Sequence, residues 1–74
     1  MRLPVVADSG TRFLDAKDIV YIEGVRNYTY MHSYDTRFLG RLSLGQIEAR
    51  EIPGMMSVHR SYIVSLRAVR GYLS

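Results

Sequence analysis

The segment from residue 57 to residue 66, Ser-Val-His-Arg-Ser-Tyr-Ile-Val-Ser-Leu, constrains the fold more than any other part of the chain. Its polar triplet, His59, Arg60 and Ser61, lies between two apolar runs, which is typical of two strands joined by a short turn. Apolar residues on both sides would hold the triplet against a core and leave Arg60 projecting. Because a guanidinium group carries a rigid fork of donors, such an arginine is suited to phosphates and to guanine edges.

The size of the chain limits it to one small domain, which we expect to span residues 1–74. The chain contains no cysteine, so its core has to hold without disulfides or thiolate metal sites. No apolar stretch approaches the roughly 20 residues that span a bilayer. The short apolar start of the chain ends at Asp8 and does not resemble a signal peptide. We therefore expect a soluble cytoplasmic protein.

The balance of charges favours a polyanionic partner only mildly. The formal net charge is +3, from ten basic and seven acidic residues. The kind of base is more informative, because Lys17 is the only lysine and every other basic residue is an arginine. Nothing after Glu51 is acidic, whereas three arginines follow it. Arginine is the side chain suited to planar, two-pronged contacts with phosphates and bases.

The apolar pattern predicts a mainly β fold of short antiparallel strands and hairpins with one short helix. Runs rich in β-branched and aromatic residues predict strands at residues 3–7, 11–14, 19–22, 28–34, 37–40, 55–58 and 62–64. We expect a polar connector, with one helical turn, over residues 15–18 and a loop over residues 23–27. Residues 66–68 are expected to form a short turn, followed by an extended segment over residues 69–73.

The helix is expected at about residues 43–51. Ser43 and Gln46, three residues apart, form a capping-box pattern at its start. Leu44 and Ile47 fall on one face, and a Pro-Gly pair at residues 53–54 ends the helix.

Four motifs in order resemble the LytTR family, the DNA-binding output domains of many bacterial response regulators. The segment at residues 57–66 resembles its HRSY-[ILV]-VN-L signature. Upstream, residues 18–24 resemble a D-I-x-Y-I-E-[AG] strand, residues 27–32 an N-Y-x-x-[VI]-H strand, and residues 42–48 an S-L-x-x-[LI]-E helix start. The resemblance covers most of residues 11–70. It implies sequence-specific binding of double-stranded DNA by loops in the major groove, as the output of a two-component transcription regulator.

The chain departs from the family pattern at two places. Ser65 stands where the family usually has asparagine, and the chain stops at Ser74, where members usually continue with a further strand pair. The third DNA-contacting loop of the family would lie in that pair, so we expect a C-terminally truncated member. A final strand at residues 69–73 would then be an open sheet edge. We predict that it pairs with another copy, giving a homodimer, or is poorly ordered. The resemblance also implies repeated sites on DNA.

The resemblance assigns DNA contacts to two loops, and the acid-free segment around the C-terminal arginines is equally consistent with phosphate contacts or with a solvated face. Arg60 is predicted to read a guanine, and Arg26 and Asn27 are predicted to enter the groove from the other loop. Tyr28, His59, Ser61, Arg67 and Arg70 complete the predicted DNA-binding set. The residues alone leave plainer roles open: a solvated Arg60, perhaps paired with Glu23 or Glu51; His59 bonded to its turn backbone; and Asn27 chosen because it tolerates a left-handed turn.

Catalysis and metal binding are not expected. His32 and His59 are the only histidines, cysteine is absent, and no His-x-x-x-His spacing occurs. His59 and Ser61 fall within one turn, and nothing marks an acidic third member of a nucleophilic triad. We expect no cofactor, no small-molecule substrate and no membrane partner.

Two rival functions belong to other classes. Tyr28, Tyr30 and Tyr34 alternate along one predicted strand and could stack single-stranded bases. The same face, with an open edge, could instead serve a protein–protein module. We favour core or half-core packing for these tyrosines, and core packing for Met55 and Met56.

Overall fold

An N-terminal hairpin opens the computed structural model, which describes residues 1–68. Strand β1 (Arg2–Ala7) pairs with β2 (Gly10–Asp15) through the register pairs from Arg2↔Asp15 to Ala7↔Gly10. Gly10 has φ +133°, a left-handed conformation that glycine adopts without strain. A single 3-10 turn, η1 (Ala16–Asp18), follows the hairpin. The helical turn expected at residues 15–18 is therefore confirmed.

Three antiparallel strands form the middle of the fold. Strand β3 (Tyr21–Val25) pairs with β4 (Tyr28–His32), and β4 pairs with β5 (Arg37–Gly40). The predicted strand at residues 19–22 thus begins later and runs to residue 25. The loop expected over residues 23–27 is only the two-residue turn Arg26–Asn27, because Glu23, Gly24 and Val25 pair with β4.

The helix α1 (Leu44–Ala49) lies within the predicted range and starts as predicted. The Ser43 side chain accepts a hydrogen bond from the Gln46 amide at 3.2 Å, and the Gln46 side chain accepts one from the Ser43 amide at 2.9 Å. This reciprocal capping box satisfies two amides that a helix start otherwise leaves unpaired. Ile47 is buried on the inner face of the helix.

A second hairpin follows α1. Strand β6 (Met55–His59) pairs with β7 (Tyr62–Ser65), with an irregular register between Ser57 and His59. Residues 66–68, for which a short turn is predicted, are helical. The predicted segment at residues 69–73 and its open edge lie outside the described residues.

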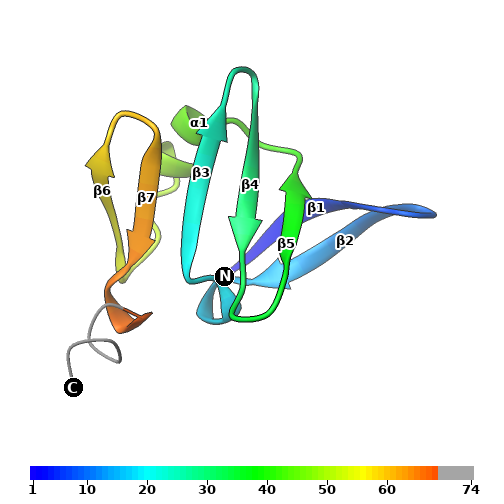
Figure 1. Cartoon of the computed structure of the whole chain (residues 1–74), viewed down its shortest axis with the longest axis horizontal. Helices are drawn as coiled ribbons and strands as arrows, with labels where there is room; N and C mark the ends of the chain where they lie inside the picture. The colour runs from blue at the N-terminus through cyan, green and yellow to red at the C-terminus, as the bar shows by residue number, and fades with distance from the viewer. Residues whose placement is uncertain (69–74) are drawn as a thin grey trace.

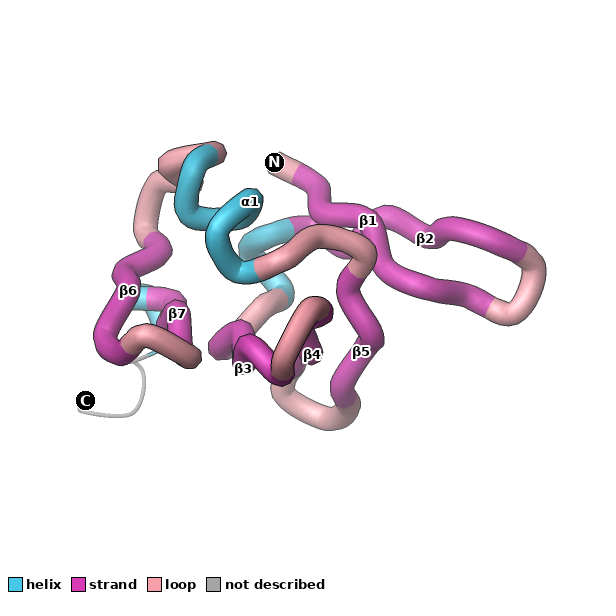
Figure 2. Tube along the Cα trace, turned by 90° about the horizontal axis from the view of Figure 1, so that it is seen from above, coloured by secondary structure: helices cyan, strands magenta, loops and turns pink. Residues whose placement is uncertain are grey.

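All seven strands of the described region form one antiparallel sheet in the order β2-β1-β5-β4-β3-β7-β6. One register pair, Val5↔Gly40, joins β1 to β5, so the first hairpin projects away from the other strands (Figure 1). Helix α1 and this hairpin lie on the same side of β3, β4 and β7 (Figure 2). The mainly β fold with one short helix is confirmed.

The core lies between that side of the sheet and the helix. It contains nine buried apolar side chains: Leu3, Val5, Leu14, Ile19, Ile22, Met31, Ile47, Ile52 and Ile63. Strand alternation explains which side chains point inward. On β4, Thr29 and Met31 are fully buried, so the other face of that strand points away from the core.

The prediction that Tyr28, Tyr30 and Tyr34 pack in or beside the core is therefore wrong in part. Tyr28 is 43% exposed, Tyr30 is half-buried, and Tyr34 is 78% exposed and lies beyond the end of β4. The small and flexible side chains of the opposite face fill the core instead. Met55 packs against the core as expected, but Met56 is 50% exposed because it points to the other side of β6.

Candidate nucleic-acid interface

The first candidate surface is the turn between β3 and β4. The register pair Val25↔Tyr28 closes a two-residue turn that exposes Arg26 and Asn27. Arg26 has φ 56°, in the left-handed region, where a side chain is disfavoured. The sequence suggested that Asn27 would take this conformation, but the structure gives it to the arginine. Strained backbone of this kind is found preferentially where function requires it.

The second candidate surface is the turn between β6 and β7. The pair His59↔Tyr62 closes the turn, and Arg60 at its tip is exposed. The Ser61 amide donates a hydrogen bond to Nδ1 of His59 at 3.1 Å. The expectation that His59 bonds to its turn backbone is therefore confirmed. Nδ1 is the acceptor in this bond, which leaves Nε2 as the ring nitrogen able to donate.

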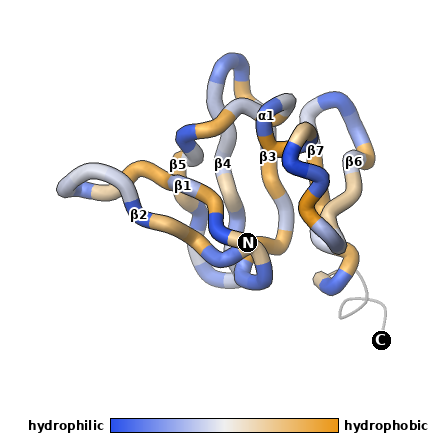
Figure 3. Tube along the Cα trace, turned by 180° about the vertical axis from the view of Figure 1, so that it is seen from behind, coloured by the Kyte–Doolittle hydropathy of each residue, from blue (hydrophilic) through white to orange (hydrophobic). Residues whose placement is uncertain are grey.

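The sheet register places these two turns side by side. Strands β3 and β7 are antiparallel neighbours with Glu23 opposite Tyr62, so the end of β3 meets the start of β7. The Gly24 amide donates to the Ser61 carbonyl at 2.7 Å, which joins the two hairpins next to their turns. Both turns emerge at the same end of the sheet (Figure 1), and both have hydrophilic tips (Figure 3).

Neither turn arginine has a carboxylate partner within residues 1–68. The one ion-pair contact found there joins His32 Nε2 to Glu23 Oε1 at 3.3 Å. The pairing of Arg60 with Glu23 or Glu51 that the sequence left open is thus not observed. Two guanidinium groups at the same end of the sheet are left available to a polyanion.

The tyrosines do not form a free stacking platform. The rings of Tyr28 and Tyr30 meet edge to face with centroids 5.9 Å apart. The Arg37 guanidinium carbon lies 4.4 Å from the Tyr30 ring centroid and covers that ring. Tyr34 follows β4 at the end of the sheet away from the Arg26 turn. Of Tyr28, Tyr30 and Tyr34, it is Tyr28 that is placed beside the two turns.

Arg67, one of the two predicted C-terminal contacts, is not part of this surface. Arg67 follows β7 and borders a hollow with Met1, Asp15 and Lys17, at the end of β7 opposite to Arg60. A four-residue strand separates the two arginines by roughly 13 Å or more. Arg70 lies outside the described residues. The structure thus brings together the residues of the two turns and separates Arg67 from them.

The sequence reasoning missed the structural importance of Gly24, which lies beside the two turns. Its amide joins the hairpins, and a Cβ there would lie 3.1 Å from Cδ2 of Leu44 on α1. A glycine inside a predicted strand signals such a close approach. The signal was lost because residues 23–27 were interpreted as a loop.

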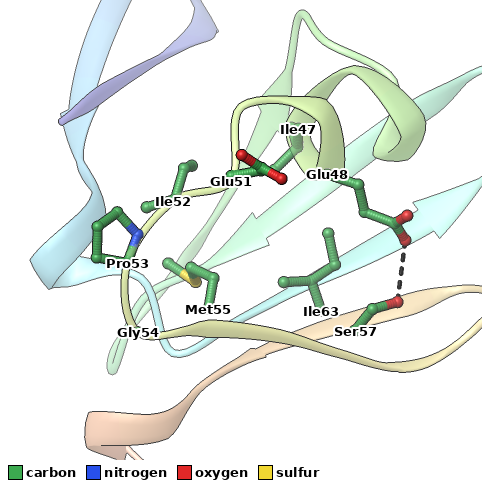
Figure 4. A pocket seen from close by; sticks show the side chains of 9 residues that line it. All are labelled: Ile47, Glu48, Glu51, Ile52, Pro53, Gly54, Met55, Ser57 and Ile63. Atoms are coloured by element: carbon green, nitrogen blue, oxygen red, sulfur yellow. Dashed lines mark hydrogen bonds between the residues drawn. The ribbon is translucent and has the colours of Figure 1, made fainter.

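A cleft of about 490 Å³ lies elsewhere, between α1 and the β6–β7 hairpin (Figure 4). Its floor is apolar, with Ile47, Ile52 and Ile63, and its rim carries Glu48 and Glu51. Glu48 accepts a hydrogen bond from the Ser57 hydroxyl at 2.9 Å. Two carboxylates at the rim make the cleft unsuitable for phosphate.

Other kinds of site are not found in the described part of the chain. Residues 1–68 hold no group of three or more histidine, cysteine, aspartate or glutamate residues placed to bind a metal. In the same residues, no helix combines the length and apolar character needed to cross a membrane.

Fold and surface together define a class: a small antiparallel β domain that presents two adjacent arginine-bearing turns from one end of its sheet. A family model described as the LytTr DNA-binding domain matches residues 9–74. The chain therefore belongs to the LytTR family of DNA-binding domains, as its motifs predicted.

The chain also has curated relatives that are named as transcriptional regulators. The chain is 41% identical over 66 residues to the heme-containing CO-sensing transcriptional regulator RcoM 2 of Paraburkholderia xenovorans. It is 32% identical over 72 residues to the CO-responsive transcriptional regulator RcoM of Rhodospirillum rubrum. These alignments cover 88% and 96% of this chain, but only 25% and 30% of the relatives.

A solved structure shares the fold. It is the LytTr DNA-binding domain of a methyl-accepting/DNA response regulator from Bacillus cereus, with a TM-score of 0.75 and 19% sequence identity. The match covers 89% of this chain and 62% of that chain.

Proposed function

We propose that the chain is a sequence-specific, double-stranded DNA-binding module of a bacterial transcription regulator, acting in the cytoplasm as one domain. The observation that carries the proposal is the pair of adjacent turns, each with an exposed arginine that has no carboxylate partner in the described region. Membership of the LytTR family supports it. So do the relatives, which are themselves named as transcriptional regulators.

The spacing of the turns suits contacts at neighbouring positions along a duplex. Neighbouring strands lie about 4.8 Å apart, so two adjacent hairpins have centres about 10 Å apart. A major groove is about 12 Å wide and admits one two-stranded ribbon. Arg26 and Arg60 would therefore each be presented to the DNA by a separate hairpin tip.

Each side chain of the two turns has a role in this proposal. Arg60 places two donors on O6 and N7 of a guanine, and Asn27 pairs with N6 and N7 of an adenine. Arg26 contacts a base or a phosphate, and the hydroxyls of Tyr28 and Ser61 donate to phosphates. Contacts to phosphates add affinity and salt dependence without sequence information.

The wider setting also belongs to the proposal. We infer that the module is the output part of a regulator and that two copies occupy repeated sites. The solved relative is named as a response regulator, whereas the curated relatives are named as CO-sensing or CO-responsive regulators. A receiver-controlled output, as the motifs suggested, and a sensor-controlled output would use the same DNA-reading surface.

Selection from a randomised duplex pool, followed by fluorescence anisotropy, tests the proposal. Arg60→Ala should relax the preference at one base position and cost roughly 1–3 kcal/mol there. Arg67→Ala is the matched control, because it removes an exposed arginine from the opposite end of β7. It should leave every base preference in place. Equal effects of the two substitutions, or no enriched sequence for the wild type, would refute sequence-specific reading by this surface.

A further inference from the structure

His59 is joined to the second turn by a bond that resembles an Asx-turn. The acceptor Nδ1 belongs to residue 59, and the donor is the amide of Ser61, two residues later. Asparagine and aspartate make the same link through Oδ1, which occupies the same position along the side chain as Nδ1. The histidine therefore shapes the backbone that carries Arg60.

The same serine connects this turn to the first one. Ser61 is held at both of its peptide groups, with its amide bonded to His59 and its carbonyl accepting the Gly24 amide at 2.7 Å. Gly24 lies two residues before Arg26 on β3. The chain of bonds from His59 through Ser61 to Gly24 thus spans the two hairpins.

The ring of His59 also has a packing contact that restrains it. Its centroid lies 5.8 Å from that of Tyr62, which in turn lies 6.4 Å from Tyr21. The side chains of Arg26 and Arg60 form no hydrogen bond or ion pair within residues 1–68. The direction of each arginine is therefore set by the backbone, which the strand pairing and these additional bonds hold in place.

We propose that His59 is a positioning residue, which fixes Ser61 and through it holds the two turns in one register so that Arg26 and Arg60 read DNA as a unit. This inference rests on the proposed function. It assigns His59 an indirect role, in place of the direct DNA contact that the sequence motif suggested.

Three substitutions at one position separate this role from others. His59→Asn keeps an acceptor where Nδ1 lies, whereas His59→Gln moves the acceptor one bond further out and His59→Ala removes it. With affinities measured well below the unfolding temperature, His59→Ala and His59→Gln should bind the selected duplex about three- to tenfold more weakly, the effect of one lost hydrogen bond. His59→Asn should bind within about twofold of the wild type.

The decisive readout is base preference at the positions read by the other turn. Arg26→Ala and Asn27→Ala together identify those positions. His59→Ala should relax preference there as well as at the position read by Arg60, while His32→Ala should not. His32 is the matched control, because it is the other histidine of the chain and pairs with Glu23 near the far end of β4. Equal binding by the Asn, Gln and Ala variants, or relaxed preference only at the Arg60 position, would overturn the proposal.

Amide hydrogen exchange tests the coupling without DNA. His59→Ala should lower the protection of both the Ser61 and Gly24 amides, and His59→Asn should preserve it. Unchanged protection of Gly24 in His59→Ala would refute the link between the turns. If the wild type shows no sequence preference at all, the proposed function fails, and the exchange result still decides whether His59 couples the hairpins.

Discussion

Thr29 and Gly40 face each other on β4 and β5, and the Thr29 hydroxyl occupies the space that a side chain at Gly40 would need. Thr29 is fully buried, and its hydroxyl donates to the Leu42 carbonyl at 2.8 Å. The bond satisfies a buried polar group and holds the chain between β5 and α1. A Cβ on Gly40 would clash with Oγ1 of Thr29 and lie 3.2 Å from Cε of Met31.

Gly40→Ala should therefore destabilise the domain by about 1–3 kcal/mol, the usual cost of overpacking a core. Urea unfolding followed by circular dichroism measures the change. Gly45→Ala is the matched control, because a Cβ there meets nothing within 4 Å and the residue lies in α1. It should stabilise the domain by about 0.5 kcal/mol. Changes of the same sign in both variants would contradict this account of Gly40.

A residue shortly after α1 allows a test of the cost of a left-handed backbone. Glu51 has φ 49° just after the helix, where a left-handed residue is usually glycine. Glu51→Gly should raise the free energy of unfolding by about 1 kcal/mol, because it removes the steric cost of a side chain in that conformation. Arg50→Gly is its control, since Arg50 has ordinary helical angles of φ −78° and ψ −12°. That substitution should lower stability by about 0.5–1 kcal/mol.

Much of the local structure could be predicted from the sequence because the signals were local. Ser43 and Gln46 form a capping box through bonds three residues apart, and the helical turn expected over residues 15–18 is a 3-10 turn capped by Asp15. The polar triplet at residues 59–61 marked its hairpin because apolar runs bound it on both sides. Such patterns depend on neighbours in the chain and need no knowledge of the whole sheet.

The orientation of β4 and the pairing of the turns could not be predicted in the same way. Side chains alternate between the two faces of a strand, so Tyr28 and Tyr30 fall on one face of β4 and Thr29 and Met31 on the other. The alternation does not say which face points to the core. That choice depends on Gly40, which leaves room for Thr29 only when the strands are in register. Likewise, the contact between Gly24 and Ser61 joins residues 37 positions apart and follows only from the strand order.

The stability of the fold at acid pH depends in part on the ionisation of Asp15. Its side chain accepts the Lys17 amide at 3.1 Å, and this hydrogen bond lowers the pKa of Asp15 below its ordinary value of 3.8. A lowered folded-state pKa contributes stability above the unfolded pKa, and this contribution is lost as the pH falls through the folded value. A carboxyl NMR titration should place the midpoint of Asp15 below 3.8. A midpoint at or above that value would contradict the cap.

Asp15→Asn is the corresponding control. Asparagine is an equally good helix cap but does not titrate. The variant should therefore keep the 3-10 turn while losing less stability than the wild type between about pH 4 and about pH 2. Urea unfolding at both ends of that range measures the difference.

Arg26 should show opposed effects on stability and DNA binding. Its φ of 56° is unfavourable for any residue with a side chain, so Arg26→Gly should stabilise the domain by about 1 kcal/mol. The same substitution removes a guanidinium group from the proposed interface and should weaken binding to the selected duplex. Urea unfolding and anisotropy on the same preparations measure the two effects.

Arg26→Lys decides what the guanidinium contacts. Lysine keeps the positive charge and the backbone strain but lacks the planar fork. If Arg26 reads a base, the lysine variant should lose preference at one position and keep the salt dependence of binding. If it contacts only a phosphate, base preferences should persist in both variants, and the salt slope should fall by about one in Arg26→Gly alone. A glycine variant that is more stable and binds as tightly as the wild type would remove Arg26 from the interface.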